Sequence, residues 1–167
     1  MSTKEIATRI VETMTANNLT LCFAESCTAG GIPKVITSVP GASKVLIGGT
    51  TAYHPIGIAH ALGLANVETL LETYNPVSEE ITEALAEVSL DTWKADICIA
   101  TTGYLGPYED DLPEHHEGWV VVTARDGVSL HHNVHLEGRR EANRQAMLRV
   151  AFELVELMLK RLTRHAV

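Results

Sequence analysis

Cysteine is scarce in this sequence of 167 residues, which contains only Cys22, Cys27 and Cys98. Their number is odd and their spacing is not that of paired metal ligands, so the pattern disfavours a disulfide framework and a zinc site. Two of the three lie inside apolar runs. We therefore expect reduced thiols, as in a cytosolic protein.

Positive charge is also scarce, because 13 Lys and Arg side chains accompany 21 Asp and Glu side chains, for a net charge of −8. Binding to nucleic acid without sequence preference depends on cations that neutralise phosphates, so we expect no nucleic-acid partner. A single small anionic ligand is still compatible with this charge, since it needs only one local cation.

The sequence also lacks any apolar run of about 18 residues, so no membrane partner is expected. The N-terminus has the pattern of an amphipathic helix and not that of a signal peptide, which predicts a cytoplasmic protein. Repeats, low-complexity segments and linkers are absent as well. With 46% apolar and 20% charged residues, the chain is expected to form one globular domain over residues 1–167.

Strand-like and helix-like patterns alternate along the chain. Ser2 and Glu5 form a capping box, and Gly48-Gly49 within a strand-like run predicts a bulge or a close approach by another segment. This alternation, with one hairpin, predicts an α/β fold: a three-layer αβα domain with a mixed sheet and helices on both faces. Strands are expected near 19–24, 45–53, 96–101, 118–124 and 128–136, and helices near 3–16, 28–38, 55–62, 67–73, from 79 and over 139–162.

The segment at 24–31, AESCTAGG, is the most informative in the chain because a strand ends there in a small, polar turn that opens a helix. Ser26 in this turn could be a nucleophile, with the N–H groups of residues 28–30 as an oxyanion hole. Cys27 competes for that role, and the turn could instead receive an anion. A turn that needs small residues only for packing is the alternative.

Ligands of such sheets bind beyond the carboxyl ends of the strands, so three segments are expected to meet there. They are the Ser26 turn, Tyr53-His54 and Thr102-Gly103. Tyr53 and His54 are the nearby candidates to activate a serine.

Arginines gather at the start of the final predicted helix, where cations oppose the helix dipole. A local anion would explain Arg139, Arg140 and Arg144. Salt bridges with Glu137 or Glu141 in a solvated first turn are the alternative explanation.

No metal or cofactor is expected. His131, His132 and His135 lie on a predicted strand, where His132 points away from the other two, so an exposed strand is favoured over a zinc site. His115-His116 offers no further partner at ligand spacing. The acidic run at 109–111 is expected to be a solvated loop, with Ca²⁺ or Mg²⁺ binding as the minor alternative.

Eight motifs in order give the chain an end-to-end resemblance to the CinA C-terminal domain family, whose characterised enzymes are nicotinamide mononucleotide amidohydrolases. The segment AESCTAGG resembles the family's AESCTGG, and the remaining similar segments follow. They are VPGAS at 39–43, GGTTAY at 48–53, ALGL at 61–64, PVSEEI at 76–81, ATTGYLGP at 100–107, GWVV at 118–121 and GRREANR at 138–144.

This resemblance implies hydrolysis of the carboxamide of nicotinamide mononucleotide to nicotinic acid mononucleotide and ammonia. Ser26 falls on the family's nucleophile, Tyr53 on its tyrosine and Thr102 on a residue that would orient substrate or nucleophile. Family members commonly self-associate, so a homo-oligomer is expected. The implied substrate-binding residues are Thr28, Ala29, Gly30 and Gly31 at the helix start, Gly103, and Arg140 or Arg144 for the phosphate.

One departure from the family pattern concerns the base. The family usually carries a lysine five residues after its tyrosine, and Ile58 occupies that position here. His54 is the best candidate for a replacement base, since it would lie one helical turn from Ile58. Two alternatives remain open: a catalytically impaired nucleotide-binding or regulatory module, and hydrolysis of a less anionic amide or ester.

Overall fold

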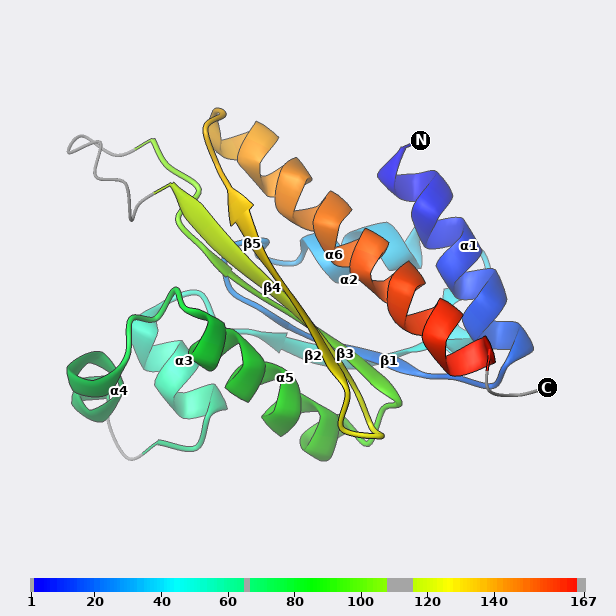
Figure 1. The fold of residues 1–167 in the computed structure, drawn as a ribbon, viewed down its shortest axis with the longest axis horizontal. Helices are drawn as coiled ribbons and strands as arrows, with labels where there is room; N and C mark the ends of the chain where they lie inside the picture. Colours follow the sequence, from blue (N-terminus) through cyan, green and yellow to red (C-terminus); the bar gives the residue numbers. More distant parts are fainter. Residues whose placement is uncertain (1, 65–66, 108–115, 165–167) are drawn as a thin grey trace.

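A computed structural model describes residues 2–64, 67–107 and 116–164, and it shows helices on both faces of one mixed sheet (Figure 1). The elements are α1 (Thr3–Ala16), β1 (Leu21–Glu25), α2 (Gly31–Thr37), the 3-10 helix η1 (Ala42–Lys44), β2 (Leu46–Thr51), α3 (Pro55–Ala61), α4 (Val67–Thr73), α5 (Glu79–Trp93), β3 (Ile97–Gly103), β4 (Glu117–Ala124), β5 (Ser129–His135) and α6 (Arg140–Arg164).

The sheet has the strand order β2-β1-β3-β4-β5. Strand β1 is parallel to both β2 and β3, whereas β4 and β5 are antiparallel to their neighbours. Glu25 at the end of β1 is paired with Thr51 of β2 and with Thr101 of β3. The three parallel strands therefore end together, and the chain segments that follow them start from one edge of the sheet.

Side chains on alternate strand positions build two separate hydrophobic cores. Leu21 and Phe23 of β1 face a core shared with α1, α2 and α6. Cys22 and Ala24 face the opposite core, shared with α3 and α5. Figure 1 shows the same division, with α1, α2 and α6 above the sheet and α3, α4 and α5 below it. The predicted three-layer αβα fold with a mixed sheet is confirmed.

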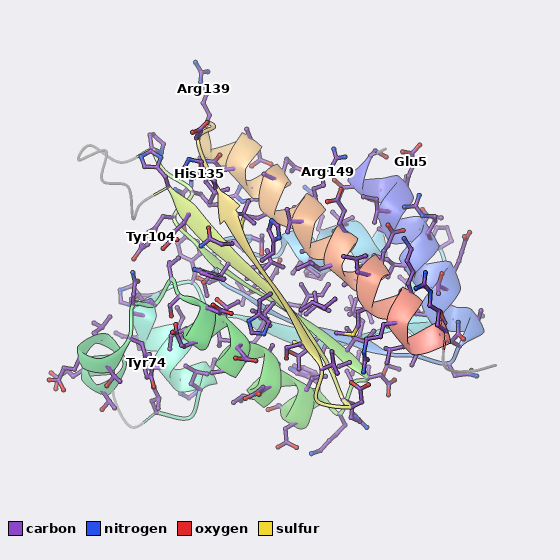
Figure 2. The ribbon with its side chains drawn as sticks, in the orientation of Figure 1. Glu5, Tyr74, Tyr104, His135, Arg139 and Arg149 are labelled. Carbon is purple, nitrogen blue, oxygen red and sulfur yellow. The ribbon has the colours of Figure 1, made fainter. Side chains whose placement is uncertain are left out.

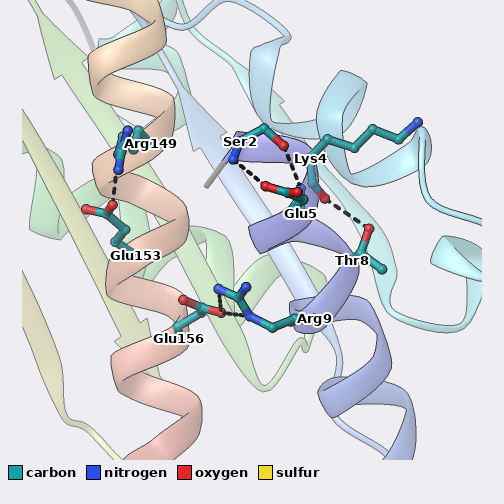
Figure 3. A network of polar contacts seen from close by, with 8 residues as sticks. All are labelled: Ser2, Lys4, Glu5, Thr8, Arg9, Arg149, Glu153 and Glu156. Atoms are coloured by element: carbon teal, nitrogen blue, oxygen red, sulfur yellow. Dashed lines mark hydrogen bonds and ion pairs between the residues drawn. The ribbon is translucent and has the colours of Figure 1, made fainter.

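Helix α1 begins with the predicted capping box, in which Ser2 Oγ accepts from the Glu5 N–H at 3.3 Å and Glu5 Oε2 accepts from the Ser2 N–H at 2.6 Å (Figure 3). Arg9 of α1 then contacts Glu156 of α6, with Nε 2.7 Å from Oε1. This pair and the apolar contacts between the two helices join α1 to α6. None of the described helices is both long and apolar enough to cross a membrane.

The Gly48-Gly49 pair in β2 has both of the predicted features. The register slips between Leu21 and Cys22, so that Ile47 is the extra residue of a bulge. A Cβ atom on Gly49 would lie only 2.3 Å from the Phe23 carbonyl oxygen, and one on Gly48 would lie 2.6 Å from the Trp93 ring. Glycine is therefore needed where β2 passes β1 and α5.

Helix α2 starts three residues later than predicted. Ala29 and Gly30 have φ values of 49° and 91°, in the left-handed region, so residues 28–30 form a turn and the helix begins at Gly31. Two consecutive residues in this conformation cannot belong to a right-handed helix. The turn that follows Ser26 is consequently longer and more sharply bent than the sequence indicated.

Candidate active site

A cavity of about 230 Å³ opens at the carboxyl ends of the parallel strands. Ser26 and Cys27 after β1, Tyr53 after β2 and Gly103 at the end of β3 all line it, so the predicted meeting of these segments is confirmed. Arg140, the first residue of α6, completes the rim. With Pro76 and Val77, which precede α5, five segments that are distant in sequence thus supply one small site.

The Ser26 turn is fixed to the neighbouring strand by its backbone. The Ser26 N–H donates to the Thr101 carbonyl at 2.9 Å, and the Ser26 carbonyl accepts from the Ala29 N–H at 3.2 Å. Thr28 Oγ1 lies 2.8 Å from Thr101 Oγ1, which adds a side-chain contact between the turn and β3. Ser26 is 9% exposed and faces the cavity from this rigid frame.

Cys27 also lines the cavity, but its thiol is unsuited to act as a nucleophile. The pKa of Cys27 is raised to about 12, mainly by burial and also by the nearby Glu25 carboxylate, although the Thr101 hydroxyl opposes the shift. Because only the thiolate is strongly nucleophilic, the neutral thiol is inert near pH 7. The environment therefore favours Ser26 over Cys27.

Tyr53 and Arg140 form a pair at the cavity rim, although 87 positions separate them in the sequence. Arg140 Nη2 donates to the Tyr53 hydroxyl, and Arg140 Nη1 donates to the Gly106 carbonyl at 2.9 Å. Both contacts fix the guanidinium beside the cavity. The neighbouring Arg139 instead extends away from the molecule at the tip of the β5–α6 connection (Figure 2).

Thr102 and Gly103 have different positions although they are adjacent. Gly103 lines the cavity, where a Cβ would lie 3.1 Å from the Cys27 sulfur. Thr102 is fully buried, and its hydroxyl lies 2.7 Å from the Thr82 hydroxyl of α5. Successive strand residues face opposite sides of the sheet, and Thr102 does not line the cavity. The expectation that Thr102 orients substrate or nucleophile is therefore not supported by its position.

The backbone N–H groups of the glycine turn are already engaged. The Gly30 N–H donates to Glu25 Oε2 at 2.7 Å, and the Ala29 and Gly31 N–H groups donate to the carbonyls of Ser26 and Thr28. These donors are not available to an oxyanion or a phosphate. The prediction that Ala29, Gly30 and Gly31 hold an anion through these groups is therefore wrong.

Arg144 lies in a different place from Arg140. A second cavity, of about 320 Å³, is lined by residues 28–31 together with Lys34 and Arg144, and it shares no lining residue with the Ser26 cavity. Arg144 Nη1 contacts Glu141 Oε2 at 2.7 Å, which is the salt bridge that the sequence offered as an alternative. Of the two predicted arginines, Arg140 is the one beside Ser26.

The side chain that replaces the family's lysine forms part of the cavity wall. Ile58 of α3 is 2% exposed and lines the cavity with Pro55, Val77 and Leu105. His54 does not line it. Its Nδ1 accepts the Ile56 N–H at 3.2 Å and caps α3, and the residue is exposed. The ring is therefore used as a helix cap, and the prediction of His54 as a replacement base is not supported by its position.

Two further residues at or beside the cavity lie in family-like motifs but were not singled out by sequence reasoning. Tyr104, labelled in Figure 2, follows Gly103, and its hydroxyl donates to Asn75 Oδ1 at 2.8 Å. Asn143 of α6 is buried and donates to the carbonyls of Leu105 at 3.0 Å and Gly138 at 2.8 Å, holding the cavity wall to the helix start. Its position within GRREANR was the available signal.

The histidines of β5 differ in their surroundings. His131 is half-buried between two carboxylates of α5, with Nδ1 2.7 Å from Glu79 and Nε2 3.2 Å from Glu83. The expectation of an exposed strand is therefore wrong for His131. Within the described residues, no three His, Cys, Asp or Glu side chains are grouped to hold a metal. His115 and the acidic run at 109–111 lie outside the described residues.

The fold and the cavity define an α/β protein with a serine-bearing site at the carboxyl edge of parallel strands. The model of the CinA C-terminal domain matches residues 3–159, and the chain belongs to this family. A CinA-like protein of Thermotoga sp. (strain RQ2) is 32% identical over 151 residues, and one of Mycobacterium tuberculosis (strain ATCC 25177 / H37Ra) is 35% identical over 141 residues.

These alignments cover 90% and 83% of this chain but only 36% and 32% of those relatives, so the chain spans about a third of their length.

Two solved structures have a similar fold over almost the whole length of both chains. Competence/damage inducible protein CihA from Agrobacterium tumefaciens has a TM-score of 0.84 at 30% identity, covering 95% of both chains. A CinA superfamily protein from Klebsiella pneumoniae has a TM-score of 0.86 at 26% identity, covering 96% of this chain and 99% of that one.

Proposed function

We propose that the Ser26 cavity is the active site of an amidohydrolase that converts nicotinamide mononucleotide to nicotinic acid mononucleotide and ammonia. The observation that carries this proposal is the meeting of Ser26, Tyr53 and Arg140 at one cavity. Each group can serve attack on the carboxamide of an anionic ligand: the serine as the nucleophile, the tyrosine hydroxyl in proton transfer and the arginine as a partner of the negative charge. Family membership supports the same chemistry.

In the proposed reaction, Ser26 Oγ bonds to the carboxamide carbon. The Tyr53 hydroxyl beside Arg140 accepts the serine proton while it gives its own proton to the amide nitrogen, so the phenol stays neutral. Cleavage of the C–N bond then releases the amide nitrogen as ammonia and leaves an ester on Ser26. One water molecule hydrolyses this ester to the carboxylate and restores the serine. The overall balance is one carboxamide and one water giving one carboxylate and one ammonium ion, which is ammonia with the proton that the carboxylic acid releases.

The size of the cavity determines how such a substrate would fit. Its volume of about 230 Å³ lies below the range of about 300–1,000 Å³ that is usual for sites of drug-sized ligands. The apolar walls formed by Ile58, Val77 and Leu105 suit the pyridine ring. The ribose and phosphate would then extend toward the rim, where Arg140 supplies a positive charge.

The direct test is release of ammonia from nicotinamide mononucleotide by the purified protein, with the Ser26→Ala variant as control. We expect release that depends on Ser26 and falls strongly in Tyr53→Phe. Equal background rates for the wild type and Ser26→Ala would refute the enzymatic proposal.

A second candidate is a ligand-binding or regulatory module without turnover. It is favoured by one observation: among the described residues, no lysine or histidine lines the Ser26 cavity, and Ile58 stands where the family carries a lysine. This candidate predicts that nicotinamide mononucleotide raises the melting temperature equally in the wild type and in Ser26→Ala. A panel of nucleotides that gives no thermal shift would count against it. Self-association and a cytoplasmic location remain predictions from the sequence.

A further inference from the structure

Glu25 is the last residue of β1 and immediately precedes Ser26, yet its side chain is 0% exposed. A carboxylate is almost never fully buried unless it is paired or hydrogen-bonded, because removal from water disfavours the charged form. Burial accordingly raises the pKa of Glu25, while hydrogen bonds from residues of the following turn oppose the shift. The position of this group therefore needs a structural explanation.

Each oxygen of the Glu25 carboxylate accepts a different backbone N–H from the start of α2. Oε2 accepts from Gly30 at 2.7 Å, and Oε1 accepts from Ile32 at 2.6 Å. The residue at the usual capping position, Gly30, has no side chain that could satisfy these donors. Glu25 thus caps the helix from the preceding strand, where a negative charge also suits the helix dipole.

The two hydrogen bonds connect the ends of the chain segment that contains Ser26. The Glu25 carboxylate joins the end of β1 to the first turn of α2, so residues 26–29 form a loop that this contact closes. The Ser26 N–H is held at the same time by the Thr101 carbonyl of β3. The direction in which the Ser26 hydroxyl enters the cavity is therefore determined by the strand on one side and by Glu25 on the other.

We propose that Glu25 is a positioning residue that holds the Ser26 turn in its reactive geometry. We do not assign it as the general base, because its carboxylate is directed to the start of α2 and does not line the Ser26 cavity. The expected effect on kcat rests on the proposed function. The effect of Glu25 on the stability of the turn does not, because amide hydrogen exchange measures it without any reaction.

The experiment compares Glu25→Gln with the wild type. The amide has nearly the same shape but only one accepting oxygen, and its NH₂ group would face a backbone N–H in place of the second. Amide hydrogen exchange at Gly30 and Ile32 is expected to accelerate by about tenfold or more at one or both sites. With nicotinamide mononucleotide as substrate, kcat is expected to fall by about 10- to 100-fold while KM changes less than about threefold.

Two controls separate positioning from a general loss of stability. Ile10→Ala removes buried apolar volume beneath α1 without changing any hydrogen bond of the turn, and should lower stability without altering kcat or exchange at Gly30. Glu25→Asp keeps the charge and should recover part of the lost rate. Unchanged exchange at Gly30 and Ile32 in Glu25→Gln, or a kcat loss no larger than that of Ile10→Ala, would overturn the proposal. A wild type that releases no ammonia would refute the enzymatic function, and exchange alone would then decide the role of Glu25.

Discussion

Replacing Ile58 by lysine tests whether the missing base limits activity. Ile58 is 2% exposed in the cavity wall, so a lysine there would place its amine among apolar side chains and near Arg140. Burial and a neighbouring cation both disfavour the charged ammonium and lower the pKa of a lysine. A neutral amine beside Ser26 can accept the serine proton, as the family pattern implies for its own lysine.

The substitution is expected to have two opposing effects. Loss of the buried isoleucine side chain costs about 1.5–3 kcal/mol in the free energy of unfolding, and desolvation of the amine adds to this cost. General base catalysis contributes about 10²- to 10⁴-fold to a rate. We therefore expect Ile58→Lys to be less stable than the wild type and to release ammonia at least about a hundredfold faster.

The assay is the initial rate of ammonia release at saturating nicotinamide mononucleotide, together with urea unfolding for each protein. Ile58→Met is the matched control, because methionine fills a similar volume but cannot accept a proton. The double variant Ile58→Lys with Ser26→Ala shows whether the gain depends on the nucleophile. The reasoning is refuted if folded, ligand-binding Ile58→Lys releases ammonia no faster than Ile58→Met.

Three further predictions concern stability and reactivity. Gly49→Ala should lower the free energy of unfolding by about 3 kcal/mol, since its methyl would overlap the Phe23 carbonyl. Gly57→Ala is the control, because its added Cβ has only ordinary contacts. Equal urea midpoints for the two variants would contradict this prediction. Iodoacetamide at pH 8 should leave all three thiols unmodified until the protein unfolds. Burial raises the pKa of Cys27 to about 12 and keeps the reagent from Cys22 and Cys98. Alkylation of the native protein would refute this prediction. Glu25 has a raised pKa in the folded state, so the folded protein binds its proton more tightly than the unfolded chain does. The free energy of unfolding should therefore fall as the pH rises from 4.5 through the folded-state pKa. Urea unfolding at a series of pH values above 4.5 should show this fall in the wild type relative to Glu25→Gln, and identical pH profiles would disprove it.

The layers and the edge of the sheet that carries the site follow from local patterns in the sequence. Alternation along β1 places Leu21 and Phe23 on one face and Cys22 and Ala24 on the other, which requires helices on both sides of the sheet. The capping box at Ser2 could also be predicted from the sequence, because Ser2 and Glu5 are only three residues apart. Both features depend only on residues that are close together in the sequence.

The chemistry of the site was decided by contacts between distant segments. Arg140 reaches Tyr53 across 87 positions, while Arg144, one helical turn further, lies at another cavity. The motif GRREANR contains both arginines and cannot distinguish them. Only the direction in which α6 passes the end of the sheet places one beside Ser26 and the other away from it.

The sequence by itself determined the family, the αβα layers and the presence of Ser26 at the end of β1. The tertiary structure decided which groups can act there: the Gly30 and Ile32 N–H groups donate to Glu25, and His54 caps α3. The physical reason is that strand and helix periodicity depends on residues close in sequence. Hydrogen-bond partners at a turn depend instead on left-handed backbone angles, as at Ala29 and Gly30, and on packing between segments that only the folded chain brings together.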